Sequence, residues 1–346
     1  MQPRIKLAIS AMLLGSISTS AWANAELDTL MKDDNQWAMA RKDYANQGYS
    51  RLSQINKSNV KQLKMAWSFA TGVNRGHEGA PLVIGNTMYI HTAFPNNVYA
   101  LDLDDNQKIV WSYFPKQDPD VQSVLCCDNV NKGLGYGDGK IFLQQNNGVL
   151  VALDAKTGAK LWDVKVNDPK MGAANTNVPH VFKDKVVTGC SGGEFGVRCH
   201  ISAYNIKDGS LAWKAYSTGS DSEVMIGADF NKENPHYSAL SVYEDVNGGN
   251  KMGGSFKSLD KAQLKFPEAN LGVRTWLKPQ QQKDGWQNGG GPTWGWYSYD
   301  PKLNLMYYGT GNPGTWNPDV RPGDNKWSMT IFARDLDTGM ARWGYQ

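Results

Sequence analysis

Charged residues are scarce in this sequence, and they do not gather into a basic or acidic tract. Asp, Glu, Lys and Arg make up 20% of the 346 residues, the formal net charge is +3, and no run of five like charges occurs. A nucleic-acid-binding protein usually carries a basic patch with interleaved aromatic side chains, and the sequence has no such platform. Nucleic acid is therefore not an expected partner.

The sequence also lacks zinc-ligand spacing and, beyond its first residues, any long apolar stretch. Its five histidines are scattered, without the short intervals that bring two ligands to one zinc ion. No segment after the N-terminal region approaches the about 20 apolar residues that a membrane-spanning helix needs. We expect neither a zinc site nor a membrane span after processing.

The N-terminus has the layout of a secretory signal peptide. Arg4 and Lys6 precede an apolar run over residues 7–17, and Ala21-Trp22-Ala23 follows as a cleavage site. The run is too short for a spanning anchor, which is the alternative interpretation. We predict a signal peptide at 1–23, or to Ala25 by an overlapping site, and a mature domain at 24–346.

The four cysteines leave two questions open. Cys126 and Cys127 are adjacent, and a bridge between them would be strained, because neighbouring Cα atoms lie about 3.8 Å apart whereas disulfides prefer about 4.4–6.8 Å. The alternative is two small buried residues that happen to be neighbours. Cys190 and Cys199 flank a Gly-rich loop and are either bridged or two buried thiols. Export to an oxidising compartment favours pairing.

An internal repeat organises the rest of the chain. The pattern Ala-x-Asp/Asn-x-x-x-Gly-x-x-x-Trp predicts a strand, a tight turn and a second strand that carries the Trp. Its starts recur about every 50 residues in the first three copies, which is the size of one four-stranded propeller blade. The copies span 100–111 (with one extra residue), 152–162, 203–213 and 333–343.

These observations predict an all-β fold, a β-propeller with tryptophan-docking repeats. Four copies correspond to about half of an eight-bladed propeller, and a closed four-bladed ring is the alternative. Further strands are expected at 82–91, 140–145, 185–188 and 305–308, with a lead-in strand at 65–69. The polar, Gly-rich segment 221–288 is expected to be a loop insertion on one face of the propeller.

Several motifs accompany the repeat and carry a specific family resemblance. The motifs are the Cys126-Cys127 pair and the segments 192–198, 294–297 and 321–330. Together they closely resemble the large subunit of bacterial methanol dehydrogenases, periplasmic eight-bladed propellers that use pyrroloquinoline quinone. The resemblance covers essentially all of the mature chain and about the first half of the family's length.

The resemblance implies a site for a planar cofactor. A Cys126-Cys127 bridge would lie against one face of the quinone and Trp294 against the other, which suits a flat disulfide and a large indole face. The other residues implied to line this site are Glu78, Lys132, Thr176, Ser191, Gly192 and Gly193. Taken without the resemblance, Trp294 would equally suit a core aromatic.

A metal site is implied beside the quinone, with Glu194 and Asn312 as ligands. A carboxylate and a side-chain amide are hard oxygen donors, suited to Ca²⁺ or a lanthanide ion. By residue type alone, Glu194 is an ordinary loop carboxylate and Asn312 an ordinary turn residue. Two departures affect the cofactor contacts: Lys132 stands where the family usually has arginine, and Pro292 where it usually has threonine.

The implied activity is oxidation of a small primary alcohol, methanol in the first place, to the aldehyde. Hydride passes to the quinone and electrons pass to a soluble cytochrome c; a small subunit or a homodimer is a further expected partner. The family's catalytic Asp lies beyond Gln346, so no catalytic residue is assigned and the chain alone is expected to be inactive. The segments 193–198 and 332–335 resemble the lanthanide-dependent branch more than the calcium branch.

Two alternatives remain at this stage. A secreted propeller with the same repeats could serve as a non-enzymatic scaffold, but it would have no reason to keep the cofactor residues together. A quinone-dependent dehydrogenase for larger alcohols would keep them.

Overall fold

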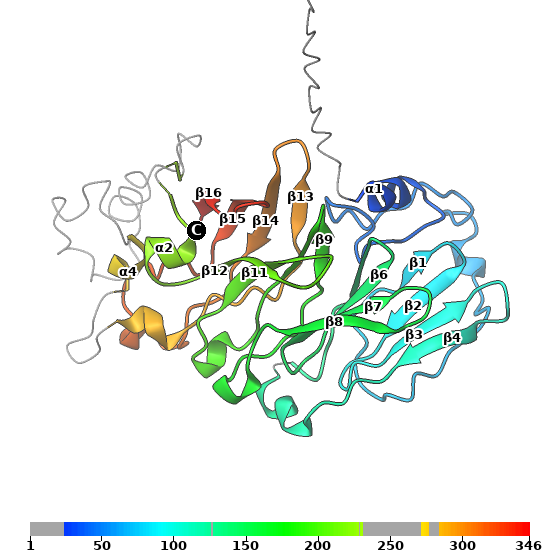
Figure 1. Cartoon of the computed structure of the whole chain (residues 1–346), viewed down its shortest axis with the longest axis horizontal. Coiled ribbons are helices and arrows are strands. Elements are labelled where there is room, and N and C mark those ends of the chain that lie inside the picture. The colour runs from blue at the N-terminus through cyan, green and yellow to red at the C-terminus, as the bar shows by residue number, and fades with distance from the viewer. Residues whose placement is uncertain (1–23, 126, 228, 231–270, 277–283) are drawn as a thin grey trace, which may run out of the picture.

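The structure is a computed structural model that describes residues 24–125, 127–227, 229–230, 271–276 and 284–346. Within these ranges the chain forms four separate four-stranded antiparallel sheets in which consecutive strands pair. Figure 1 shows the sheets following one another along the chain, with the C-terminus beside helix α2. Both the propeller architecture and the all-β class are confirmed.

Each sheet is one blade, and its strands are bounded as follows. The first blade contains β1 (Leu82–Ile84), β2 (Thr87–His91), β3 (Val98–Asp102) and β4 (Lys108–Tyr113). The second contains β5 (Leu134–Gly137), β6 (Lys140–Gln144), β7 (Val149–Asp154) and β8 (Lys160–Lys165). The third contains β9 (His180–Phe182), β10 (Lys185–Thr188), β11 (His200–Asn205) and β12 (Leu211–Tyr216). The fourth contains β13 (Ser298–Asp300), β14 (Leu305–Gly309), β15 (Ile331–Asp335) and β16 (Ala341–Tyr345).

The sequence repeat corresponds to the third and fourth strands of every blade. In each copy the repeat Ala lies directly opposite the repeat Trp, and a register shift follows that Ala. The paired residues are Ala100 with Trp111, Ala152 with Trp162, Ala203 with Trp213, and Ala333 with Trp343. The alignment of the four copies, with one extra residue in the first, is therefore structurally correct.

The repeat tryptophans join consecutive blades. The indole Nε1 of Trp111 donates to the carbonyl oxygen of Ala155 in the next blade at 2.9 Å, and Trp213 donates to Leu336 at 2.7 Å. Gly158 fits beneath the Trp111 ring: it has a φ of 72°, and a Cβ added there would lie 2.6 Å from ring carbons. The glycine is required by this close approach, and tryptophan docking is confirmed as the inter-blade contact.

The contact between Trp213 and Leu336 makes the third and fourth blades neighbours in space. The chain between β12 and β13 therefore leaves the propeller and returns to it. Of the predicted insertion at 221–288, the described parts are α2 (Asp221–Val224), α4 (Leu271–Arg274) and η7 (Gly285–Asn288), and the rest lies outside the described residues.

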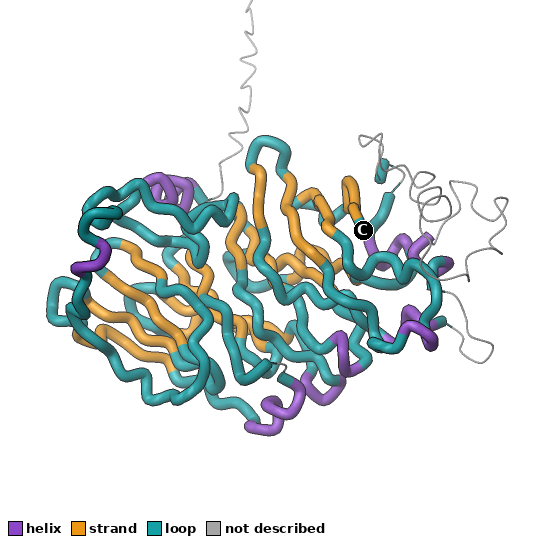
Figure 2. Tube along the Cα trace, turned by 180° about the vertical axis from the view of Figure 1, so that it is seen from behind, coloured by secondary structure: helices purple, strands orange, loops and turns teal. Residues whose placement is uncertain are grey.

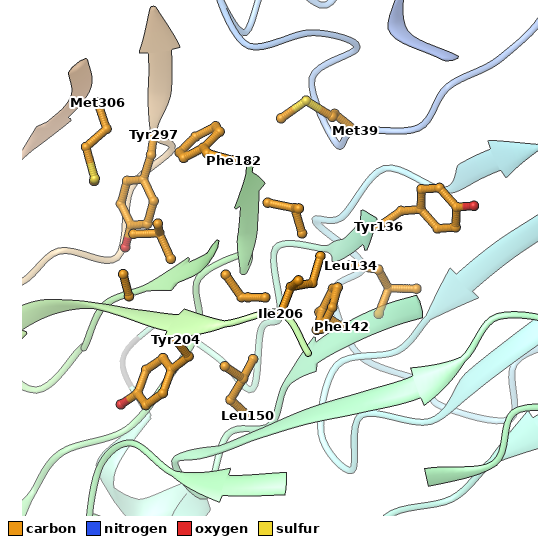
Figure 3. Close-up of a cluster of buried hydrophobic side chains, with 14 of the residues drawn as sticks. Met39, Leu134, Tyr136, Phe142, Leu150, Phe182, Tyr204, Ile206, Tyr297 and Met306 are labelled. Atoms are coloured by element: carbon orange, nitrogen blue, oxygen red, sulfur yellow. The ribbon is translucent and has the colours of Figure 1, made fainter. Parts of the chain in front are cut away.

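The core lies between the blades, where strands bury alternate or successive apolar side chains. Figure 3 shows part of it, with Phe142 and Leu150 of the second blade and Phe182 of the third. Phe182 stacks on Tyr299 of the fourth blade at a ring-centroid distance of 5.1 Å. Each such fully buried apolar side chain contributes about 1.5–3 kcal/mol, so the blade interfaces stabilise the fold.

Helices are short and lie around the sheets, as the view from behind shows (Figure 2). The remaining ones are α1 (Ala25–Lys32), η1 (Val60–Gln62), η2 (Pro119–Val124), η3 (Pro169–Met171), η4 (Gly193–Phe195) and η8 (Pro318–Val320). No helix in the described ranges has the length and apolar character to cross a membrane.

Two strand predictions need correction. Residues 82–91 form a hairpin, β1 and β2, because Gly85 and Asn86 make a turn that brings Ile84 opposite Thr87. The lead-in strand at 65–69 is wrong: this segment pairs with no strand in the part of the chain that the structure describes, and Met65 is 83% exposed. A strand needs a neighbouring edge for its backbone hydrogen bonds, so its apolar pattern alone is not sufficient.

Candidate functional site

The site begins with two segments that run side by side, residues 75–80 and 128–133. Ala80 and Gly133 form an isolated parallel bridge between them. Two ion pairs cross the same interface: Lys132 Nζ lies 3.7 Å from Glu78 Oε2, and an Arg75 nitrogen lies 3.6 Å from an Asp128 oxygen. The structure therefore brings Glu78 and Lys132 together, although they are far apart in the sequence.

Lys132 also contacts Trp294, the predicted stacking residue. Its Nζ lies 4.9 Å from the centre of the indole ring, within range of a cation–π interaction. The Lys132 side chain is 16% exposed, whereas Trp294 is 46% exposed. Trp294 is therefore not a core aromatic like Trp111 or Trp213: much of its surface is available to a ligand.

Thr176 and Ser191 lie next to Lys132 and extend the candidate site. The backbone N–H of Lys132 donates to the carbonyl oxygen of Thr176 at 3.0 Å. The Thr176 Oγ1 and Ser191 Oγ atoms are 2.9 Å apart and share a hydrogen bond. Both residues are buried, so two hydroxyls and a lysine are held at one place by backbone contacts.

The motif Gly-x-Ser-x-Gly occurs at residues 189–193, but the environment of Ser191 is not that of a hydrolase nucleophile. In the described structure its hydroxyl partner is Thr176, and no histidine hydrogen bonds to it. A nucleophilic serine needs an adjacent general base and an exposed oxygen. Ser191 is suited to binding instead.

The glycines at 192 and 193 allow chain segments to approach closely. Gly192 has a φ of 108°, and a Cβ there would overlap with the carbonyl oxygen of Gly172. A Cβ on Gly193 would lie 3.0 Å from Pro292 Cδ. Pro292, one of the two departures from the family pattern, thus packs against the start of the loop that carries Glu194.

Glu194 lies in η4, in a loop closed by a disulfide. Cys190 and Cys199 are joined with an S–S distance of 2.01 Å, so of the two alternatives that the sequence leaves open the structure has the bridge. The Glu194 side chain is partly exposed, in contrast to its buried neighbours Gly193 and Ser191. A carboxylate held in a closed loop and open on one side can serve as a metal ligand.

Asn312 is connected to the same loop through the segment 289–292. Gly291 donates its N–H to the carbonyl oxygen of Asn312 at 2.8 Å, and Gly290 donates to Val197 at 2.9 Å. The Asn312 amide nitrogen donates to the carbonyl oxygen of Pro313 at 3.2 Å, so Oδ1 is the side-chain atom of Asn312 that is chemically able to bind a cation.

Glu194 and Asn312 together suit a hard cation whose remaining ligands come from other groups, such as those of a bound organic molecule. Glu194 and Asn312 offer oxygen atoms, which Ca²⁺ and similar ions prefer. In the ranges that the structure describes, no three His, Cys, Asp or Glu residues cluster to form a closed metal cage. Ca²⁺ takes about six to eight ligands, so a bound organic carboxylate or carbonyl has room to join these two.

The cysteine pair is only partly described. Cys126 lies outside the described residues, so the vicinal bridge stays a prediction. Cys127 is exposed, with a φ of 65°, and Asp128 follows with a φ of 71°. Two successive non-glycine residues in the left-handed region are uncommon, and such strain is often found in binding loops.

The sequence did not predict the buried amides that support the segment around Thr176. Asn175 Nδ2 donates to Gly189 O at 2.7 Å, and Asn177 Nδ2 donates to Thr188 Oγ1 at 2.8 Å. Both amides are buried and flank Thr176, so they fix its backbone. The signal was present in the sequence as an Asn-Thr-Asn triplet, because buried amides occur where their hydrogen bonds are satisfied. Arg75 and Asp128 were also missed, although both are charged residues close to predicted site residues.

The buried histidines do not contribute a titrating group near neutral pH. Burial lowers the pKa of His91 and of His180 to about 4, and that of His200 to about 3. His91 lies beside the site, with Nε2 3.0 Å from the carbonyl oxygen of Asn131. A neutral histidine in this position supports the backbone of Asn131 and Lys132.

Comparison with known proteins shows consistent similarity. The sequence family described as "PQQ: Glucose/ethanol/alcohol dehydrogenase, beta-propeller domain" matches residues 37–238 and 266–346. The chain is 49% identical over 342 residues to a lanthanide-dependent methanol dehydrogenase of Methylorubrum extorquens, covering 98% of this chain and 51% of that protein. It is 47% identical over 346 residues to methanol dehydrogenase [cytochrome c] subunit 1 of Methylobacterium organophilum, covering 98% and 50%.

The solved structure of a europium-containing methanol dehydrogenase superposes with a TM-score of 0.80 at 50% identity. That superposition covers 93% of this chain and 50% of the other. The chain thus spans about half the length of the curated relatives it matches.

Proposed function

We propose a function that follows from the family to which this chain belongs, the pyrroloquinoline-quinone-dependent glucose/ethanol/alcohol dehydrogenase β-propeller family. The chain supplies the cofactor-binding half of a quinoprotein alcohol dehydrogenase. The observation that carries the proposal is the convergence of Glu78, Lys132 and Trp294 at one place. A scaffold propeller would need the repeat but not this arrangement. The proposed reaction is oxidation of a small primary alcohol, methanol in the first place, to its aldehyde.

When bound, pyrroloquinoline quinone would supply the acceptor for the electron pair of the alcohol, and a hard cation would supply the positive charge that polarises this acceptor. Trp294 would pack its exposed indole face on the planar ring. Lys132 would donate to an oxygen of the anionic cofactor from one side of that indole, and its pairing with Glu78 would fix its position. Thr176 and Ser191 would offer hydroxyls to the cofactor's carboxylates.

Glu194 and Asn312 would hold the cation through one carboxylate and one amide oxygen. The 49% identity to a lanthanide-dependent enzyme supports a lanthanide as the physiological ion, with Ca²⁺ as the alternative. Cys126 and Cys127 are proposed to cover the opposite face of the quinone from Trp294. The general base is proposed to be an Asp beyond Gln346, so no residue of this chain is assigned that role.

The proposal extends to location and partners. Residues 1–23 are proposed to be a signal peptide and 24–346 a partial propeller domain with an insertion at 221–288, exported to the periplasm. A soluble cytochrome c is the proposed electron acceptor, in line with the name of the subunit 1 relative. A small subunit or a second copy of the chain is a further proposed partner. Larger alcohols are a second substrate class, which the family description supports because it includes glucose and ethanol.

The test is a reconstitution of the complete gene product. The purified protein is supplied with the quinone and either Ca²⁺ or a light lanthanide, and reduction of cytochrome c is followed with methanol, ethanol and longer alcohols. Methanol-dependent reduction with the lanthanide supports the proposal. No reduction with any alcohol under either metal rejects the enzymatic function.

A further inference from the structure

Arg198 stands at the end of the Glu194 loop, directly before the disulfide residue Cys199. Its backbone forms an isolated bridge with Gly290. Gly290 donates to the carbonyl oxygen of Val197 at 2.9 Å and accepts from the N–H of Cys199 at 3.2 Å. The loop therefore leaves the metal-ligand region through a backbone contact with the segment that also reaches Asn312.

The Arg198 guanidinium lies between two aromatic rings. Its Cζ is 4.4 Å from the ring centre of Tyr216 and 4.4 Å from that of Trp286. Arginine stacks well on aromatic faces because its charge is delocalised over a plane. Tyr216 ends strand β12 and Trp286 belongs to η7, so the side chain joins the propeller to the end of the insertion.

The same guanidinium is held at its edges by hydrogen bonds. Nη1 donates to Glu223 Oε1 at 3.1 Å, and Nη2 donates to the carbonyl oxygen of Thr218 at 2.7 Å. Two rings and two acceptors leave the guanidinium little freedom to rotate. We call these five residues, Arg198, Tyr216, Thr218, Glu223 and Trp286, the Arg198 clamp.

The partners in the clamp are themselves fixed. Glu223 forms a capping box with Ser220 at the start of α2, in which Ser220 N donates to Glu223 Oε2 at 3.0 Å. Thr218 Oγ1 donates to the carbonyl oxygen of Trp286 at 3.2 Å. The clamp is thus an anchor and not a chance surface contact.

The disulfide and the clamp constrain the loop in different ways. The Cys190–Cys199 bridge joins the two ends of the loop to each other, which limits its shape. Arg198 joins the loop to β12, α2 and η7, which limits its position relative to the rest of the molecule. A metal ligand needs both, because a displacement of a fraction of an ångström weakens coordination by a hard cation.

We infer that Arg198 is a positioning residue that sets the place of the Glu194 carboxylate by anchoring the end of its loop. The inference rests on the proposed function, since it concerns the same cation site. Arg198 does not touch the ion; it acts through the backbone of Val197 and Cys199. Loss of such supporting residues typically lowers metal affinity by about 10- to 100-fold.

The experiment measures metal binding directly. The complete gene product is stripped of metal, supplied with the quinone, and titrated with Tb³⁺ while tryptophan-sensitised luminescence is recorded; Ca²⁺ is then used as a competitor. We expect Arg198→Ala to weaken Tb³⁺ binding by about 10- to 100-fold. Arg198→Lys keeps the charge but loses the planar stacking and the second hydrogen bond, so an intermediate affinity is expected.

Lys214→Ala is the matched control. Lys214 Nζ lies 4.9 Å from the centre of the same Tyr216 ring, but in the described structure its side chain forms no hydrogen bond or ion pair with residues 190–199. Its removal should leave Tb³⁺ affinity unchanged. Circular dichroism and the melting temperature of each variant are recorded, and titrations are performed well below the lowest melting temperature, so that only folded protein is compared.

Two outcomes would overturn the inference in distinguishable ways. If wild-type protein binds Tb³⁺ and Arg198→Ala binds it equally well, even with a lower melting temperature, Arg198 has only a structural role and the proposed function stands. If wild-type protein binds neither Tb³⁺ nor Ca²⁺, the proposed cation site fails and the role of Arg198 fails with it.

Discussion

Lys132 Nζ lies 4.9 Å from the ring centre of Trp294, although 162 residues separate the two in the sequence. The contact joins the segment after the cysteine pair to the segment before the fourth blade. It creates a partly exposed indole with a cation over its ring. A planar anionic ligand would be recognised by both groups at once.

Replacing Trp294 should therefore weaken quinone binding. Trp294→Ala removes the stacking surface and the cation–π partner of Lys132, which together amount to roughly 1–2 kcal/mol, or about a five- to thirtyfold loss of affinity. Equilibrium dialysis of the quinone against the complete protein measures the change. Trp316→Ala is the control, because Trp316 is also exposed, at 72%. Equal losses in both variants would contradict a specific role for Trp294.

Lys132 should matter through its charge. Lys132→Gln removes the cation beside Trp294 and leaves Glu78 without its partner, so affinity for the anionic quinone should fall severalfold and depend less on salt. Lys140→Gln is the matched control. The Lys140 side chain is also 16% exposed and pairs with an aspartate, but it lies at the β5–β6 turn and not at the candidate site. Quinone affinity measured at low and high salt decides the matter, and an unaltered affinity in Lys132→Gln would refute this role.

The disulfide should stabilise the fold and the metal loop together. The double variant Cys190→Ala/Cys199→Ala lacks the bridge without leaving a free thiol, and closing a loop this short is worth about 3 kcal/mol or less. We expect a lower denaturation midpoint and weaker Tb³⁺ binding. Thiol counting on denatured, unreduced wild-type protein provides an independent check, since two reactive thiols assigned to Cys190 and Cys199 by mass spectrometry would show that the bridge is absent.

Tryptophan docking makes a sharp prediction about glycine. Gly158 and Gly139 both have positive φ values, 72° and 65°, but only Gly158 faces a ring, that of Trp111. Replacing either by Ala costs about 1–2 kcal/mol of backbone strain, and Gly158→Ala adds about 1–3 kcal/mol of overpacking. Urea denaturation of both variants measures the difference. If Gly139→Ala is as destabilising as Gly158→Ala, the inter-blade contact is not what requires the glycine.

The buried histidines predict a pH dependence of stability. The pKa of His180 falls from 6.5 to about 4 on folding because of burial, so the unfolded chain binds more protons between these values. Stability is therefore lost as the pH falls from about 6.5 towards 4, with a slope of up to about 1.4 kcal/mol per pH unit for this histidine. His180→Gln should reduce the slope in that window. An identical pH profile for His180→Gln and wild type would contradict this assignment.

Sequence reasoning captured what is local and periodic. The spacing of Ala152, Gly158 and Trp162 is a local pattern, and each residue has a distinct structural task, so the blades could be predicted. The hairpin at β1 and β2 is harder to predict because its turn, Gly85 and Asn86, is only a two-residue interruption of an apolar run. The strand predicted at 65–69 failed because pairing depends on a neighbouring edge, which no local pattern encodes.

The site could be predicted as a set of residues but not as a set of contacts. The family motifs named Glu78, Lys132 and Trp294, yet nothing in the sequence said that Lys132 would lie between the other two. The pairing of Arg75 with Asp128 and the clamp around Arg198 are contacts across long stretches of chain. They depend on how the blades and the insertion pack, which is a property of the folded chain.

Quinone uptake by the complete gene product shows whether this chain forms a cofactor site. Metal-free protein is dialysed against pyrroloquinoline quinone with Ca²⁺, with a light lanthanide, or with chelator, and the bound chromophore is quantified for wild type and Glu194→Ala. We expect stoichiometric, metal-dependent uptake by wild type and a marked loss of the metal dependence in Glu194→Ala. If the wild-type protein takes up no quinone with either metal, the convergence of Glu78, Lys132 and Trp294 is not a cofactor site.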